Sequence, residues 1–159
     1  MSRLGEGNNP RRGVLYSTTD GRNWEWITAL QVPGISATTL RFQPDDKIIA
    51  LIRKQYIGSS KPPYRDWDIH KIDVPIGGPN FIRLPDGSLW GSGRYRDSDG
   101  EPRTALARMT TETYQPVLIL PSGGDHSYPG LVWHDELLWI SYYSSHERRT
   151  SIYLAKVKI

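Results

Sequence analysis

A hairpin unit recurs along the chain with a fixed period, and this recurrence limits the possible folds more than any other feature. A short apolar strand leads to the turn Pro44-Asp45-Asp46 and to a second strand that ends at Arg53. The same pattern returns around Pro85-Asp86-Gly87 and ends at Arg94. Pro44 and Pro85 stand 41 positions apart, as do the two arginines. A period of about 40–50 residues with several strands in each unit is typical of a β-propeller.

A third copy of the hairpin lies near the C-terminus. Two apolar runs, Leu131–Trp133 and Leu137–Ile140, flank His134-Asp135-Glu136, and Tyr143 takes the place of the arginine. Two hairpins per period give four-stranded antiparallel blades. We therefore predict an all-β propeller with about three blades and almost no helix, because no segment keeps a 3.6-residue period. The expected blades are the last two strands of one, two complete blades at about 37–73 and 79–120, and three strands of another at about 127–157.

Composition narrows the class of partner. The chain of 159 residues is long enough for one domain, which we place at 13–159 after a flexible polar arm at 1–12. Six Trp and nine Tyr are typical of carbohydrate sites, whereas a net charge of +3 with scattered Lys and Arg argues against nucleic acid. There is no Cys, and no apolar run approaches the roughly 20 residues of a membrane span. We expect a soluble protein without a membrane partner, in a compartment that the sequence does not reveal.

Two segments resemble a known family. The run S-T-T-D-G-R-N-W (Ser17–Trp24) resembles the Asp-box, or BNR repeat, of the sialidase (neuraminidase) superfamily, and Ser60–Trp67 keeps the ends of that pattern. Gly77–Gly87 and Tyr128–Glu147 look like parts of the second half of bacterial sialidase-family proteins. The resemblance implies a six-bladed propeller, of which this chain would be half. The box itself is expected to lock a turn and to take no part in catalysis.

The resemblance also implies a substrate with a carboxylate at the reacting carbon. Guanidinium groups match a carboxylate and keep their charge, and Arg53 and Arg94 end equivalent strands, so we expect both at one mouth of the propeller. A carboxylate substrate repels a carboxylate nucleophile, and sialidases use a tyrosine instead. Tyr128 resembles that nucleophile. A phenol needs a nearby base, and because Ser36–Thr39 stands where the family has its glutamate, Glu147 is the candidate substitute.

The C-terminal hairpin supplies two further candidates. It doubles back, so its ends should meet, which makes His126 and Tyr143 candidate substrate-binding residues beside Tyr128. The histidines lack a regular spacing with carboxylates, so we predict no metal site. The glycine pairs Gly77-Gly78 and Gly123-Gly124 are expected to be blade-linking turns rather than phosphate cradles, and we predict no cofactor.

Two functions remain open. The chain is either part of a sialidase-like glycoside hydrolase with an incomplete active site, or a non-catalytic glycan-binding or structural propeller module. The resemblance places the family's acid/base aspartate and first arginine in blades that this chain lacks. Three blades would also leave two apolar faces open, and exposed surface of that kind marks an association site. We therefore expect a carbohydrate partner, with a sialoside as the case that the resemblance implies, and a homo-oligomer, with two-fold symmetry as one arrangement.

Overall fold

The computed structural model describes residues 12–96 and 100–159, and these residues form β-strands without any helix. The prediction of an arm at 1–12 therefore concerns residues that, Arg12 excepted, lie outside the described part. Within that part, no helix has the length and apolar character needed to cross a membrane.

The strands are β1 (Gly13–Ser17), β2 (Glu25–Leu30), β3 (Thr38–Phe42), β4 (Ile48–Ile52), β5 (Lys54–Ser60), β6 (Asp68–Arg83), β7 (Leu89–Arg96), β8 (Pro102–Met109), β9 (Tyr114–Leu120), β10 (His126–His134), β11 (Leu137–Glu147) and β12 (Arg149–Val157).

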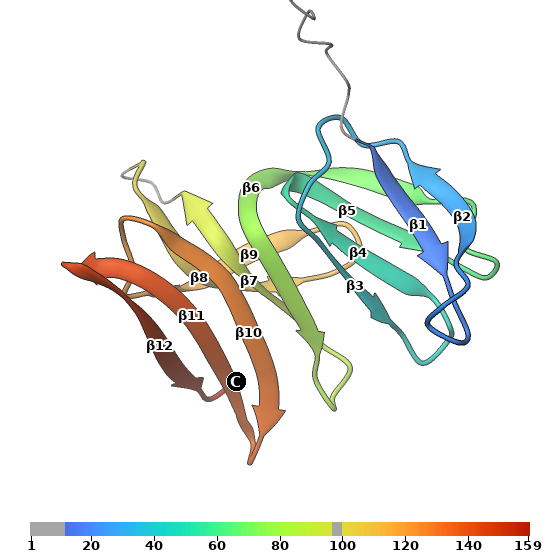
Figure 1. Ribbon diagram of the computed structural model, residues 1–159. Helices are drawn as coiled ribbons and strands as arrows, with labels where there is room; N and C mark the ends of the chain where they lie inside the picture. Colours follow the sequence, from blue (N-terminus) through green and yellow to red (C-terminus); the bar gives the residue numbers. More distant parts are fainter. Residues whose placement is uncertain (1–11, 97–99) are drawn as a thin grey trace, which may run out of the picture.

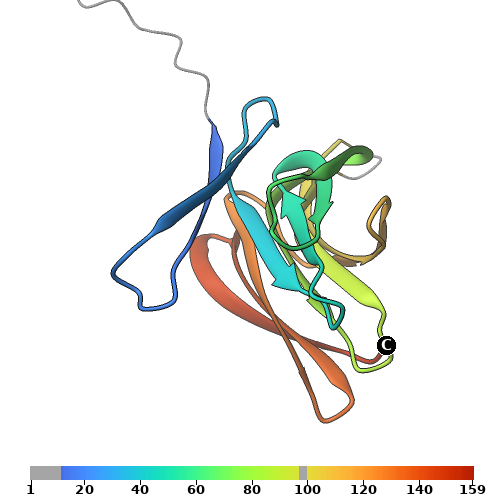
Figure 2. The same ribbon diagram turned by 90° about the vertical axis from the view of Figure 1, so that its right-hand side faces the viewer.

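The strands group into blades, as the repeat predicts. All pairs are antiparallel, and the hydrogen-bonded orders are β1-β2, then β3 to β9 in sequence, then β10-β11-β12. The long series consists of two four-stranded blades that share β6. We call β3–β5 with the first half of β6 blade 1, the second half of β6 with β7–β9 blade 2, and β10–β12 blade 3. The hairpin β1–β2 stands beside blade 1 as a separate two-stranded layer (Figures 1 and 2).

Strand β6 differs from the prediction, which placed a linking turn at Gly77-Gly78. It is one continuous strand of 16 residues that changes partner along its length. Lys54 of β5 pairs with Ile76, whereas Gly77 already pairs with Arg94 of β7. Gly78 has a φ of +51°, a left-handed conformation that glycine adopts without steric cost. The glycine pair therefore acts as a bend between two blades inside a strand.

The first strand of each blade lies next to the first strand of the following blade. Contacts join β3 to β6 and β6 to β10. The Thr39 hydroxyl donates to the Pro79 carbonyl at 2.8 Å, and the Asn80 amide donates to the Pro129 carbonyl at 2.8 Å. These three strands form the inner row, which is the arrangement of a propeller.

Two apolar clusters fill the spaces between neighbouring blades, and a third packs against blade 1. Leu51 of β4 packs with Phe81 and Met109 between blades 1 and 2. Leu106 packs with Leu138 between blades 2 and 3, and a third cluster joins the segment after β2 to blade 1. Each blade therefore depends on its neighbour for its core, so the described blades form one body.

Two turns adopt the conformations that their residues predict. Asp135 and Glu136 both have positive φ, 48° and 57°, so they make the type I′ turn that a two-residue hairpin favours. In the β1–β2 turn, the Asp20 carboxylate accepts hydrogen bonds from the Asn23 and Arg22 backbone N–H groups, each at 2.8 Å. These bonds hold the pKa of Asp20 well below its usual value. Asp20 therefore stabilises a turn between two strands.

Candidate functional site

One face of the blades collects the equivalent ends of the second strands. The Arg53 N–H donates to the Ala37 carbonyl just before β3, Arg94 pairs with Gly77, and Tyr143 pairs with Ser127. Each residue thus stands opposite the start of an inner strand. We call this face, where β4, β7 and β11 end and the inner strands begin, the mouth. Tyr143 occupies in blade 3 the place that arginine occupies in blades 1 and 2, as the sequence register predicts.

Arg94 ties blade 2 to blade 3 at the mouth. Its Nε donates to the His126 carbonyl at 2.9 Å, its Nη2 donates to the same carbonyl, and its Nη2 lies 3.2 Å from Asp125 Oδ1. The carboxylate and the carbonyl belong to the segment that leads into β10. A charge-assisted network of this kind fixes both partners more firmly than neutral hydrogen bonds do.

Two tyrosines stand beside this network. The Tyr143 hydroxyl donates to Asp125 Oδ1 at 3.0 Å, so the carboxylate is shared between Tyr143 and Arg94. The rings of Tyr128 and Tyr143 are nearly parallel, at 13°, with centroids 6.4 Å apart. Tyr128 is 57% exposed. Burial, and next the hydrogen bond to Asp125, raise the pKa of Tyr143, so its phenol remains a donor at neutral pH. The pair offers an aromatic surface with a polar edge.

The backbone before this surface adopts unusual angles. Ser127 and Tyr128 have φ values of 146° and 49°, which non-glycine residues rarely adopt. The buried Ser127 hydroxyl donates to the Gly77 carbonyl at 2.8 Å, and this bond crosses from blade 3 to β6. Such strain persists only where the surroundings enforce it, and it is common at functional sites. Here the unusual backbone at Ser127 and Tyr128 lies directly at the residue whose ring stacks on Tyr143.

The structure places the His126 side chain, a predicted substrate-binding group, in the interior of the protein. Its side chain is completely buried, and its Nδ1 lies 3.0 Å from the Gly124 carbonyl. The backbone carbonyl of His126, by contrast, accepts a hydrogen bond from Arg94. The sequence places His126 at the strand start, but which face of β10 carries the ring depends on the irregular backbone at Ser127 and Tyr128.

Burial of His126 leads to an expected dependence of stability on pH. Burial lowers the pKa of His126, the Gly124 carbonyl opposes this shift, and the positive charge of Arg94 adds to it. The unfolded chain therefore takes up a proton near pH about 6.5 while the folded chain does not. We expect the free energy of unfolding to fall as the pH is lowered from 7.5 to 5.5, measured by urea denaturation at each pH. His126→Asn should weaken this dependence and His134→Asn, at an exposed site, should not; an equal slope in all three proteins would contradict the prediction.

Glu147 is not at the tyrosine pair. Its Oε2 accepts a hydrogen bond from the Tyr153 hydroxyl at 3.1 Å, and the Tyr153 ring stacks on Tyr142 at 5.6 Å. Successive side chains of a strand point to opposite faces, so this stack lies on the other face of β11 from Tyr143. Glu147 is therefore bonded to Tyr153, and its predicted role beside Tyr128 stays a prediction. The carboxylate that does lie at the pair is Asp125, whose position directly before β10 is the sequence clue that was missed.

The two predicted arginines line one cavity. Arg53 and Arg94 border a hollow of about 170 Å³, together with the further cations Lys54 and Arg96. Within the described part of the chain, the Arg53 side chain has no hydrogen-bond or ion-pair partner. The structure thus brings Arg53, Arg94, Tyr128 and Tyr143 to one face. No group of three or more potential metal ligands gathers among the described residues.

Comparison with known proteins bears on the fold. No protein-family model and no curated protein matches the chain. Solved structures do match. A GH43 glycoside hydrolase engineered for endo-xylanase and exo-arabinofuranosidase activity has a TM-score of 0.59 at 14% identity, over 90% of this chain and 33% of its own. The Bacteroides ovatus xyloglucan PUL GH43B has a TM-score of 0.64 at 15% identity, over 92% and 34%. The Bacillus halodurans xylan β-1,4-xylosidase has 0.62 at 14%, over 92% and 35%.

These matches bear on the resemblance to the sialidase superfamily that the sequence suggested. The chain spans about a third of the length of these three structures. GH43 enzymes are five-bladed propellers and not members of the sialidase superfamily, so the likeness supports the propeller fold and does not support the sialidase assignment. Identities of 14–15% show the fold alone. The chain has the fold of a partial β-propeller.

Proposed function

We propose that the mouth binds a carbohydrate that carries a carboxylate, within a propeller of the glycoside hydrolase type. The observation that carries this proposal is the aromatic pair of Tyr128 and Tyr143 beside two arginines that border one cavity. A sugar ring has an apolar face that packs on tyrosine rings, and its hydroxyls suit the polar edge. A guanidinium binds a carboxylate through two parallel hydrogen bonds.

The two arginines have different parts in this proposal. Arg53 has an unengaged guanidinium among the described residues, so it is the main ligand for the carboxylate. The Nε and Nη2 of Arg94 are occupied by His126 and Asp125, whereas Nη1 makes no hydrogen bond with a described residue. Arg94 therefore offers its remaining donors in a fixed orientation. Asp125 holds Arg94 and Tyr143 in place and also gives the site a hydroxyl acceptor.

Cleavage of a sialoside is the second candidate, and one observation favours it. A phenol nucleophile needs a carboxylate base, and Tyr143 lies 3.0 Å from Asp125. Tyr128, which the family resemblance implies as the nucleophile, has no carboxylate hydrogen bond among the described residues. The raised pKa of Tyr143 and the need for an acid/base residue from another blade both favour binding over cleavage for this chain alone.

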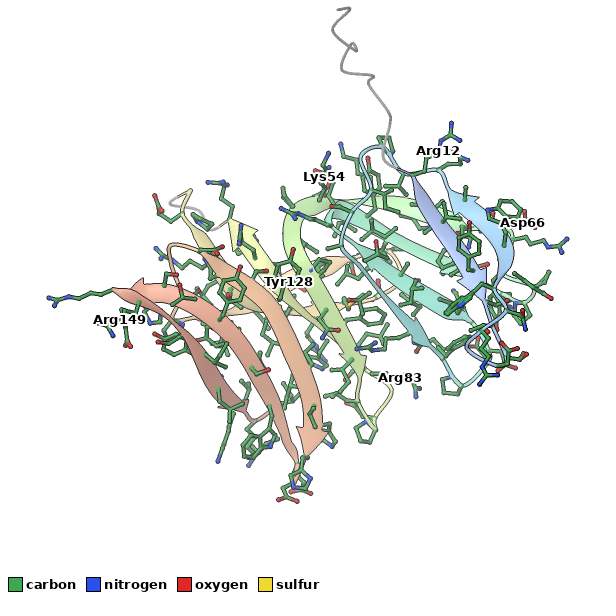
Figure 3. All side chains as sticks on the ribbon, viewed as in Figure 1. Arg12, Lys54, Asp66, Arg83, Tyr128 and Arg149 are labelled. Atoms are coloured by element: carbon green, nitrogen blue, oxygen red, sulfur yellow. The ribbon has the colours of Figure 1, made fainter. Side chains whose placement is uncertain are left out.

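The test is binding of the purified chain to a panel of acidic and neutral glycans, with a fluorogenic sialoside as a turnover assay. We expect acidic glycans to bind, and Arg53→Gln and Tyr128→Ala each to weaken binding. Arg83→Gln is the matched control, because Arg83 is the last residue of β6 and lies away from Gly77, where β6 meets the mouth (Figure 3). Turnover that Tyr143→Phe or Tyr128→Phe abolishes would establish the hydrolase instead. A chain that binds no acidic glycan would refute the proposal.

We also propose that further copies of the chain cover the open faces. Blade 3 has three strands where blades 1 and 2 have four, so the outer edge of β12 is unpaired. On one face of blade 3, Val132, Ile152 and Leu154 are 59%, 77% and 60% exposed. At the opposite end of the series of blades from blade 3, Tyr16 and Trp26 of the β1–β2 hairpin are also exposed. Apolar surface of this kind is typical of an association site.

Self-association leads to an expected change in mass. Ile152→Lys and Leu154→Lys together should reduce the mass measured by light scattering at micromolar concentration to that of one chain, because two buried charges oppose the contact. Val117→Lys is the matched control, since Val117 is an exposed apolar residue on β9 of blade 2 and outside blade 3. A wild-type protein with the mass of a single chain would rule out the oligomer.

A further inference from the structure

We infer that the cavity beside the mouth is a second anion-binding subsite, so that the ligand is an oligosaccharide with acidic groups on at least two units. This inference rests on the proposed function. One acidic unit packs on Tyr128 and Tyr143, and the neighbouring acidic unit enters the cavity. Lys54 and Arg96 are its specific cations, which the sequence did not single out.

The fold brings these cations together from two blades. Arg53 and Lys54 come from the junction of β4 and β5 in blade 1, and Arg94 and Arg96 come from the end of β7 in blade 2. The part of β6 that passes from one blade to the other lies between them and lines the cavity with Ile76 and Gly77. The four cations belong to two equivalent strand ends, so the repeat itself creates the cluster.

The cavity has an unbalanced charge. Four of its nine described lining residues are Lys or Arg, and none of these nine is Asp or Glu. The whole chain has a net charge of only +3, so this is a local excess. Like charges at short range repel, and an oxyanion between them relieves the repulsion. A phosphate, sulfate or carboxylate has the required charge, and a carboxylate on a sugar is the one that the neighbouring aromatic pair favours.

Size and position indicate how the ligand extends. A hollow of about 170 Å³ is smaller than the roughly 300–1,000 Å³ of a typical ligand pocket, so it holds one charged unit and not a whole oligosaccharide. Arg53 and Arg94 both border the cavity, and Arg94 also contacts Asp125 of the tyrosine network, so the two sites share these arginines. Figure 3 shows Lys54, at the start of β5 in blade 1, and Tyr128, on β10 of blade 3. On this proposal, one sugar unit lies on the tyrosine pair and the neighbouring unit lies in the cavity.

The positions of Lys54 and Arg96 are defined by the backbone. Lys54 has a φ of +82°, and its Nζ lies 2.7 Å from where a side chain on Gly34 would begin. Arg96 Nη1 donates to the Gly100 carbonyl at 2.6 Å, and its Nε and Nη2 make no hydrogen bond with a described residue, so they are the donors that we assign to the ligand. Glycine at 34 thus leaves the space that the Lys54 ammonium occupies.

The test compares ligands that differ only in the number of acidic units. Titration calorimetry would measure galacturonate, trigalacturonate and carboxyl-reduced trigalacturonate, and in parallel sialic acid and its α2,8-linked dimer. We expect the multiply charged ligands to bind more tightly than the single units, and Lys54→Gln and Arg96→Gln each to weaken that binding about threefold, as expected for an exposed ion pair. Binding of the single acidic units should remain unchanged in both variants.

Arg149→Gln is the matched control, because it removes the same charge at the far tip of blade 3 (Figure 3). Raising the salt from 50 to 500 mM should weaken the multiply charged ligands more than the single units, since screening acts on every ion pair. If the single units bind as tightly as the longer ligands, and Lys54→Gln and Arg96→Gln change nothing, the second subsite is refuted while the proposed function stands. If no acidic ligand binds at all, the proposed function itself fails.

Discussion

Replacing Arg94 with glutamine is expected to weaken binding of acidic glycans at least about tenfold and to lower stability by about 1–3 kcal/mol. The substitution removes the charge that the ligand recognises. It also removes the donors to the His126 carbonyl and to Asp125 at the contact between blades 2 and 3, which leaves Asp125 with only its hydrogen bond from Tyr143 among the described residues. Titration calorimetry and urea denaturation measure the two effects separately.

The control for Arg94 is Arg83→Gln, which removes an arginine from the same blade at the end away from the mouth (Figure 3). It should leave glycan binding unchanged. Arg94→Lys adds a second test, because a lysine keeps the charge but lacks the planar fork that reaches two acceptors at once. Full binding by the glutamine variant would show that Arg94 serves only to join the blades.

Gly78→Ala is expected to destabilise the protein by roughly 2–4 kcal/mol, because it combines a left-handed backbone with overpacking. A methyl group at this position would lie 2.4 Å from Ser127 Oγ and 3.1 Å from the Tyr128 backbone nitrogen. The Ser127 hydroxyl is buried and bonded to Gly77, so it has little room to move. Relief of the clash would displace Tyr128, so glycan binding should fall together with stability.

Gly21→Ala separates the cost of the left-handed backbone from the cost of overpacking. Gly21 has a similar φ of +70°, but no atom lies within 4 Å of the added methyl group. It should therefore cost only the about 1–2 kcal/mol of the left-handed conformation and leave glycan binding intact. Thermal unfolding and calorimetry of the two variants make the comparison. Equal losses of stability would mean that close packing of β6 against β10 does not constrain the mouth.

The fold was largely predictable because its evidence is local and repeated. A hairpin needs alternating side chains and a suitable turn, and both are written in consecutive residues, as at Asp135 and Glu136. The 41-residue repeat then placed Arg53 and Arg94 at equivalent strand ends, and the structure brings them to one cavity. Local evidence did not reveal that β6 serves two blades, because a change of partner within one strand depends on where the blades pack.

The site was less predictable because its contacts join residues from different blades. Glu147 and Asp125 are both carboxylates near the ends of the same hairpin, and the sequence gives no reason to prefer one. The choice depends on which face of β11 each reaches: Glu147 meets Tyr153, and Asp125 meets Tyr143. The burial of His126 was equally unpredictable from the sequence, because it depends on the irregular backbone at Ser127 and Tyr128.

The sequence by itself determined that this protein is an all-β chain of repeated hairpins whose equivalent strand ends carry Arg53, Arg94 and Tyr143. Periodicity and turn chemistry act between neighbouring residues, so they can be read without coordinates. Only the tertiary structure decided that Asp125 joins Arg94 to Tyr143 and that Lys54 and Arg96 border the same cavity as the arginines. Those contacts depend on the angle and distance between blades, which are set by the apolar clusters packed between them.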